Sequence, residues 1–150
     1  MFKQSRKKSR RSRQRRQPQI LQVVSKTESL QARTLLSSVT FNSGKLEINL
    51  TGDDSVEVKS DHASIQILIE GKTHGPIFSP ADISSFSVVA GDGDNLVDIS
   101  SLHPINFPAL NSHGAFVRGG GGDDTVIGSR MADTIHGGHG DDLLLSLIHI

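Results

Sequence analysis

The sequence predicts an all-β chain whose C-terminal end is a short parallel β-roll (a β-solenoid). Apolar residues from Val39 onward alternate with polar ones, and this period of two is that of a half-buried strand. Residues 119–145 divide without a gap into three similar nonapeptides, and similarity at a fixed short period indicates a repeat architecture. No segment has the apolar spacing of a long helix.

The composition limits the chain to one modest domain and excludes several kinds of site. The 150 residues are 35% hydrophobic and 4% aromatic, with neither Trp nor Tyr, so the core is expected to be thin. There is no Cys, which excludes disulfide bonds, thiolate zinc sites and a Cys nucleophile. There is also no run of 18 apolar residues, so no membrane span is predicted.

Residues 1–19 are predicted to be a disordered basic tail. Residues 1–16 hold nine Lys and Arg and no acid, whereas the other 134 hold seven Lys and Arg and sixteen Asp and Glu. Such a tail could be a nucleic-acid arm that binds phosphate, or the basic start of an export or sorting signal. The second interpretation is favoured because no aromatic residue is interleaved for base stacking and the rest of the chain is acidic. No specific nucleic-acid partner is therefore expected.

Residues 20–38 are predicted to be a sorting or signal-like segment. Their apolar stretch at 20–24 is too short for a normal secretory signal. The segment instead resembles the LExR-x-LLS-A signature of planctomycete-type extracellular proteins, through Leu30, Arg33, Leu35, Leu36 and Ser37. Gln31 and Ser38 stand where that signature has Glu and Ala. The resemblance implies export to the cell surface, and the alternative is a Leu-rich turn without a sorting role.

Residues 39–110 are predicted to be rich in β-strands. The turn residues Asn42-Ser43-Gly44 separate two alternating segments, so a hairpin is expected there. Further strands are expected where apolar residues alternate or cluster, at 56–58, 65–69, 86–89 and 96–99. Prolines are expected to interrupt the strands at Pro76, Pro80, Pro104 and Pro108.

Two turns in this region share a core with the repeats that follow. Gly52-Asp53-Asp54 and Gly93-Asp94-Asn95 each place an acid and then Asp or Asn after a Gly, shortly before an apolar residue. Neither has a tandem partner in the sequence. They are therefore interpreted as isolated structural turns rather than as metal sites.

The predicted roll at 111–145 contains the three nonapeptides GGGGDDTVI, GSRMADTIH and GGHGDDLLL. Their sixth position is an acid and their eighth position is apolar: Asp124, Asp133 and Asp142, then Val126, Ile135 and Leu144. The first and third nonapeptides also have Gly at the first, second and fourth positions, whereas the second keeps only its first Gly.

This pattern, G-G-x-G-x-D-x-U-x, resembles the RTX (haemolysin-type) calcium-binding repeat. The resemblance implies that Ca²⁺ is bound by the repeat turns of a secreted or cell-surface protein. The residues expected to form the calcium sites are Gly119, Gly120, Gly122, Asp124, Asp133, Gly137, Gly138, Gly140 and Asp142. Calcium ions, together with cell-surface or matrix components, are the expected partners.

Elementary chemistry explains each position of the repeat. Gly permits positive φ, so that loop carbonyls point inward as hard oxygen ligands beside the Asp carboxylate, and calcium favours six to eight such oxygens. If nine residues make half a coil, Asp124 and Asp142 stack at the ~4.8 Å spacing of neighbouring strands. At that distance two carboxylates repel by ~3–4 kcal/mol for an effective dielectric of about 20. Calcium binding and folding are then one equilibrium, and Asp133 has no stacking partner.

Two other features of the repeat region are given no function. His136 and His139 invite a zinc interpretation together with His113, but they occupy the free ninth and third positions of their repeats, and no third ligand is placed to converge with them. The last residues, Leu-Ser-Leu-Ile-His-Ile at 145–150, leave the repeat and resemble a translated sequencing-library adaptor. Residues 146–150 are therefore expected to be a non-native or truncated end, and a natural apolar cap is the alternative.

The favoured function is calcium binding that stabilises the β-roll of a fragment of a secreted or surface protein. The alternative is a folding or secretion module of a larger secreted hydrolase whose catalytic domain lies elsewhere. No enzyme activity is expected of this segment, because it has neither an HExxH nor a GxSxG motif.

Overall fold

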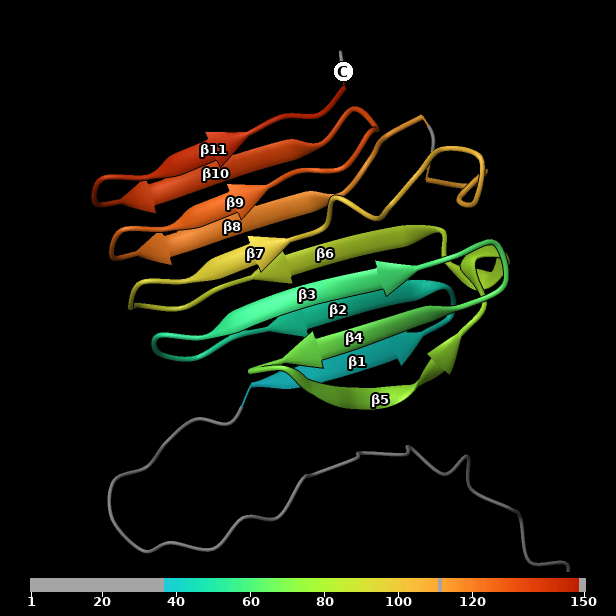
Figure 1. Cartoon of the computed structure of the whole chain (residues 1–150), viewed down its shortest axis with the longest axis horizontal. Coiled ribbons are helices and arrows are strands. Elements are labelled where there is room, and N and C mark those ends of the chain that lie inside the picture. The colour runs from blue at the N-terminus through green and yellow to red at the C-terminus, as the bar shows by residue number, and fades with distance from the viewer. Residues whose placement is uncertain (1–36, 111, 149–150) are drawn as a thin grey trace, which may run out of the picture.

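The computed structural model describes residues 37–110 and 112–148, whose regular elements are β-strands apart from one short 3-10 helix, in agreement with the all-β prediction (Figure 1). The strands are β1 (Ser38–Asn42), β2 (Lys45–Asn49), β3 (Ser55–Ser60), β4 (Ile65–Ile69), β5 (Lys72–Phe78), β6 (Ser85–Val89), β7 (Leu96–Asp98), β8 (Phe116–Gly121), β9 (Thr125–Ile127), β10 (Thr134–His139) and β11 (Leu143–Leu145). A 3-10 helix, η1, spans Pro80–Asp82. No helix in the described part is long and apolar enough to cross a membrane. The expected basic tail at 1–19, and the sorting segment up to residue 36, lie outside the described residues.

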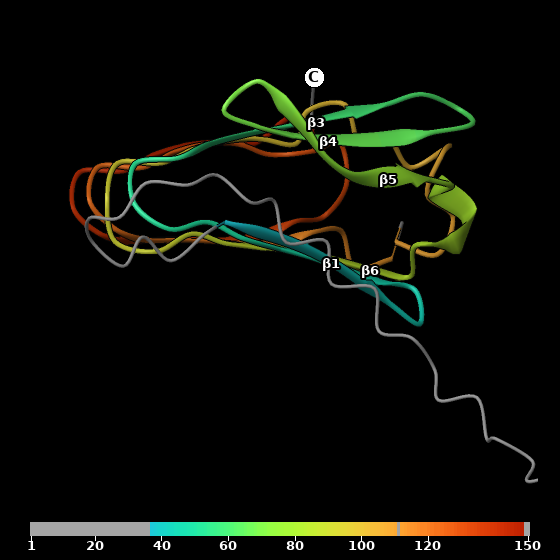
Figure 2. The same ribbon diagram turned by 90° about the horizontal axis from the view of Figure 1, so that it is seen from below.

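The strands form two facing sheets (Figure 2). One has the order β1-β2-β6-β8-β10 and the other the order β11-β9-β7-β3-β4-β5. From β5 onward the chain crosses to the opposite sheet after every strand. β6 pairs in parallel with β2 and β7 with β3, and each of the later strands β8 to β11 pairs in parallel with the strand two before it in the chain. Successive turns of the chain are therefore laid beside one another along the length of both sheets.

Antiparallel hairpins occur only near the N-terminal end of the described residues. The predicted hairpin of β1 and β2 is confirmed, and positive φ at Ser43 and Gly44 gives its turn the twist that a tight hairpin needs. Glu70 and Gly71 provide the same backbone conformation between β4 and β5. In the β3–β4 turn, the backbone N–H groups of residues 63 and 64 donate to Asp61, which holds the pKa of that carboxyl below its usual value.

One expected strand break is wrong. Pro76 lies within β5, although prolines were expected to end the strands. The strand continues because β5 is the last strand of its sheet and pairs only with β4, so the missing N–H of proline is not needed for a second neighbour. By contrast, Pro80 begins η1 and Pro104 lies outside the strands.

The parallel strands have three different offsets along the chain. Ser55 of β3 aligns with Leu96 of β7, and Leu96 aligns with Thr125 of β9. The last step, from Thr125 to Leu143 of β11, is the 18-residue offset predicted from two nonapeptides. The earlier steps are longer because the chain inserts more residues between the paired strands, first the antiparallel strands β4 and β5 with η1 and then the loop at 100–115. Both η1 and that loop lie at one edge of the molecule (Figure 1).

The core lies between the two sheets and continues into the loop at 100–115. Alternate residues of the strands fill it, and Leu102, Phe107 and Leu110 of the loop are also buried. Burial decreases toward the last strands, because nothing in the described residues covers β10 and β11. Thus Val126 is fully buried, whereas Leu144 is 43% exposed.

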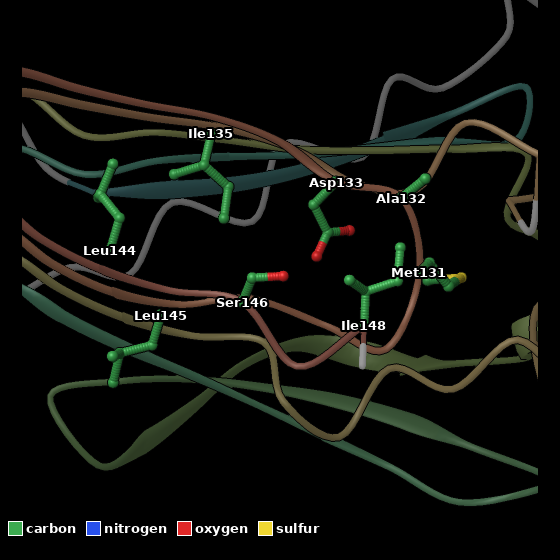
Figure 3. Close-up of a pocket in the computed structure, with 8 residues that line it drawn as sticks. All are labelled: Met131, Ala132, Asp133, Ile135, Leu144, Leu145, Ser146 and Ile148. Carbon is green, nitrogen blue, oxygen red and sulfur yellow. The ribbon is translucent and has the colours of Figure 1, made fainter. Parts of the chain in front are cut away.

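The uncovered end of the core is a shallow hollow of about 420 Å³ (Figure 3). Apolar side chains of β10 and β11 line it together with residues of the turn before β10 and of the segment after β11: Met131, Ala132, Asp133, Ile135, Leu144, Leu145, Ser146 and Ile148. The inward-facing side chains of the last two nonapeptides therefore line a surface that is partly exposed to solvent.

Candidate metal centre

Four turns that each join one sheet to the other lie one behind another at a single edge of the molecule (Figures 1 and 2). They precede β3, β7, β9 and β11, and each ends in a pair of acidic or amide residues. We call these pairs the rungs of an acidic stack: Asp53-Asp54 (rung 1), Asp94-Asn95 (rung 2), Asp123-Asp124 (rung 3) and Asp141-Asp142 (rung 4).

The first residue of each rung forms an outer column of hydrogen bonds. The Asp94 N–H donates to Asp53 Oδ1 at 3.1 Å, the Asp123 N–H to Asp94 Oδ1 at 2.8 Å, and the Asp141 N–H to Asp123 Oδ1 at 2.8 Å. Each carboxylate therefore accepts from the backbone of the next rung along the chain.

The second residue of each rung forms an inner column that runs in the opposite direction. The Asp54 N–H donates to Asn95 Oδ1 at 3.2 Å, the Asn95 N–H to Asp124 Oδ1 at 2.9 Å, and the Asp124 N–H to Asp142 Oδ1 at 3.1 Å. Here each side chain accepts from the backbone of the previous rung. The two columns together join every rung to its neighbours by side-chain hydrogen bonds.

The stack corrects one interpretation made from the sequence. The turns at 52–54 and 93–95 are not isolated, because they are hydrogen-bonded to each other, and the turn at 93–95 is bonded to the first repeat. The sequence did not indicate this relation, because the β4–β5 hairpin with η1 and the loop at 100–115 separate these turns by more than 18 residues. The signal that could have found them is the shared Gly-acid-Asp/Asn core itself.

The predicted neighbours Asp124 and Asp142 are adjacent in the stack, as their 18-residue separation requires. Their rungs carry four carboxylates, and among the described residues none of these four forms an ion pair with a basic side chain; the ion pair present there joins Lys59 and Glu57, at 3.3 Å. The excess negative charge at this edge is therefore not neutralised by the described basic residues.

One oxygen of the stack has no hydrogen-bond partner. Asp124 is 1% exposed, and although its Oδ1 accepts from Asn95, its Oδ2 is buried without any donor. It is the one such side-chain atom within the described part of the chain. A buried polar atom without a partner costs about 1–3 kcal/mol, and more if it is charged. This oxygen therefore lacks the hydrogen-bond donor or cation that a buried carboxylate needs.

The surroundings of that oxygen form a cradle of oxygen atoms. A Cβ on Gly119 would collide with both Asp124 Oδ2 and the carbonyl oxygen of Gly137, so these two oxygens converge on the space that the glycine leaves open. In the next rung, a Cβ on Gly137 would likewise collide with Oδ2 of Asp142. The buried Asp124 Oδ2, which has no donor, and the carbonyl oxygen beside it fit a hard cation such as calcium.

The remaining glycines of the two complete repeats shape the turns. Four of them have positive φ: 121° at Gly120, 103° at Gly122, 129° at Gly138 and 122° at Gly140. The turns are also in close contact, since a Cβ on Gly138 would meet the carbonyl of Gly120. Any other residue would be strained there and would push the rungs apart.

Asp133 lies apart from the stack, in the turn that leads from β9 back to β10. Its carboxylate accepts hydrogen bonds from the Ser129 N–H at 2.6 Å, the Ser129 hydroxyl at 2.7 Å and the Ala115 N–H at 2.8 Å. The structure thus surrounds Asp133 with donors and does not bring it to Asp124 or Asp142. Ser129 is a partner that the sequence analysis did not identify.

The histidines are placed at the surface of the repeat region. His136 and His139 are exposed, and the His136 ring lies 5.8 Å from that of Phe116. Across residues 37–110 and 112–148, no three His, Asp or Glu side chains converge closely enough to hold a metal ion by themselves. A calcium site in the stack would therefore draw several of its oxygens from the backbone.

Comparison with known proteins identifies the segment that contains rungs 3 and 4. Residues 118–146 match the family of the RTX calcium-binding nonapeptide repeat (4 copies), which confirms the resemblance found in the sequence. No curated protein and no solved structure matches the chain. The match includes Asp133 but does not extend to the turns at 52–54 and 93–95.

Proposed function

Because residues 118–146 are RTX nonapeptide repeats, which bind Ca²⁺, we propose that this chain binds calcium between rungs 3 and 4 of the acidic stack. The observation that carries the proposal is the buried, unpartnered Asp124 Oδ2, which faces the same space as the Gly137 carbonyl oxygen. A cation in that space supplies the positive partner that the described residues lack.

The proposed ligands are oxygens of the two complete repeats. Asp124 contributes its free Oδ2, Asp142 contributes its carboxylate, and carbonyls of the glycine turns at 119–122 and 137–140 complete the shell. Calcium accepts both carboxylate and carbonyl oxygens, so this mixed donor set suits it. Asp133 has a different role in this proposal, since its hydrogen bonds to Ser129 and Ala115 already hold its own turn closed.

Bound calcium stabilises the proposed parallel β-roll by removing repulsion between the carboxylates of neighbouring rungs. The gain in stability grows with calcium concentration, because an ion that binds only the folded state shifts the folding equilibrium by mass action. Extracellular calcium modules bind at about 10⁻⁴–10⁻³ M, and a single complete pair of rungs is expected to lie in that range. We place the chain in the extracellular or cell-surface environment, where calcium at that level is present.

The proposal is tested by following unfolding of the whole chain by circular dichroism in EDTA, in millimolar Ca²⁺ and in millimolar Mg²⁺. Calcium is expected to raise the unfolding temperature, and magnesium to raise it less. Asp124→Ala and Asp142→Ala are expected to remove the calcium response, because each deletes a proposed ligand. Asp82→Ala, which removes an exposed carboxylate of η1, is the control and is expected to keep it. A response that survives both ligand changes contradicts the assignment.

A further inference from the structure

Rung 2 is hydrogen-bonded directly to rung 3 but lies outside the RTX repeats. The register of β7 with β9 aligns Asn95 with Asp124, and that of β6 with β8 aligns Ala90 with Gly119. The two turns also share positive φ at their equivalent glycines, 117° at Gly93 and 103° at Gly122. They differ at the preceding glycine, because Gly120 has a positive φ of 121° and the aligned Gly91 does not, and in the two side chains that face the cradle.

Both polar side-chain atoms of Asn95 are hydrogen-bonded within the protein, whereas one of the two carboxylate oxygens of Asp124 is not. Both residues are buried, at 2% and 1% exposure, and both use Oδ1 to accept a backbone N–H of the previous rung. The second atom of Asn95 is an amide nitrogen, and it donates to the carbonyl of Gly93 in its own turn at 2.7 Å. The second atom of Asp124 is an oxygen without a partner. In rung 2, the amide group of Asn95 thus donates a hydrogen bond at the position where a cation would contact Asp124 Oδ2 in rung 3.

In rung 2, Ala90 fills the space that Gly119 leaves open in rung 3, just as Asn95 lacks the negative charge of Asp124. At position 119 a Cβ would collide with the Asp124 carboxylate and the Gly137 carbonyl, so only glycine leaves the cradle open. The aligned residue in rung 2 is Ala90, whose methyl group is buried in the core at 4% exposure. Neither the volume nor the oxygen needed for an ion is therefore present there.

We propose that Ala90 and Asn95 make rung 2 a metal-independent rung that ends the column of calcium sites. This inference rests on the proposed calcium site between rungs 3 and 4. The strands before rung 2 are then held without calcium, by their hydrogen bonds and the apolar core, and dependence on calcium begins at residue 119. The double substitution Ala90→Gly/Asn95→Asp should convert rung 2 into an additional calcium site.

The test counts calcium ions on the whole chain by equilibrium dialysis and measures unfolding temperature in EDTA. Ala90→Gly/Asn95→Asp is expected to bind one more calcium ion than the wild type, to unfold at a lower temperature in EDTA, and to gain more from calcium. The reverse exchange, Gly119→Ala/Asp124→Asn, is expected to lose a calcium ion and to lose most of the calcium response. Asn49→Asp adds the same charge at an exposed position of β2 and is expected to leave the number of ions unchanged.

The outcomes separate this inference from the proposed function. If the wild type binds calcium but the Ala90→Gly/Asn95→Asp variant binds the same number of ions, rung 2 is not controlled by these residues and the inference is overturned. If that variant does not fold even with calcium, Gly119→Ala/Asp124→Asn decides: unchanged calcium binding overturns the inference and loss of an ion supports it. A wild type that binds no calcium overturns the proposed function, and this inference with it.

Discussion

At the scale of single residues, the acidic stack depends on positions where a side chain of any size is excluded. Gly120 and Gly52 both have positive φ, at 121° and 87°, but they differ in what surrounds them. A Cβ on Gly120 would meet the backbone carbonyl of Gly91, whereas a Cβ on Gly52 would meet nothing within 4 Å. Comparing substitutions at these two glycines therefore distinguishes the free-energy cost of backbone strain from the cost of pushing two rungs apart.

Gly120→Ala is expected to destabilise the chain more than Gly52→Ala. Both changes force a non-glycine residue into a left-handed conformation, which costs about 1–3 kcal/mol. Only Gly120→Ala adds a collision with backbone, which cannot move without displacing rung 2. Urea unfolding of both variants in EDTA measures the difference, and equal destabilisation would show that contact between the turns is unimportant.

At the scale of elements, the loop at 100–115 is an extension of the core rather than a surface connection. Phe107 is fully buried between the sheets, while Ile105, two residues away, is 74% exposed. Hydrogen bonds within the loop, such as that from the Leu110 N–H to the Phe107 carbonyl at 3.1 Å, hold it in this shape. The loop thus fills the space that the strands leave at the edge opposite the acidic stack.

Phe107→Ala is expected to lower the free energy of unfolding by about 3–5 kcal/mol, since it leaves a large cavity in a thin core. Ile105→Ala in the same loop is expected to change it by less than about 0.5 kcal/mol, because the side chain is mostly in solvent. Chemical denaturation monitored by circular dichroism measures both values. Similar values for the two variants would show that the loop is not part of the cooperative core.

At the scale of the whole molecule, the sequence predicted the regular part of the fold better than the irregular part. Alternation of apolar residues identified the strands between residues 39 and 110 except β5, where an interruption at Pro76 was expected, and the nine-residue period placed Asp124 beside Asp142. The longer offsets could not be predicted, because they depend on how many residues the β4–β5 hairpin and the loop at 100–115 insert between the paired strands. For this reason the sequence did not show that Asn95 would stack on Asp124.

The candidate site was only partly predictable for a related reason. The glycines and acids of the two complete repeats follow from the pattern, but hydrogen bonding depends on which chain segments meet. Asp133 occupies the same sixth repeat position as Asp124, yet in the structure it accepts from Ser129 and Ala115. Only three-dimensional contact distinguishes a carboxylate with three donors from one with an unpartnered oxygen.

The molecule as a whole is expected to open from its C-terminal strands. The edge strands β10 and β11 have no covering layer in the described residues, whereas β3 lies between β7 and β4 in its sheet. In EDTA, amide hydrogens of β10 and β11 should exchange faster than those of β3 and β4. Calcium should slow exchange mainly in β8 to β11. Mass-spectrometric hydrogen exchange measures this, and uniform protection along the chain would contradict it.

The two long edges of the molecule differ in how well they tolerate inserted residues. At the edge of the acidic stack, every turn is bonded to the next, so a single inserted residue would break both columns of hydrogen bonds. At the other edge, the chain already makes detours of very different length between strands that still align in register. Foreign peptide segments grafted into that second edge would therefore be carried by the scaffold without disturbing the proposed ion site, which makes it the natural place to attach a probe or tag.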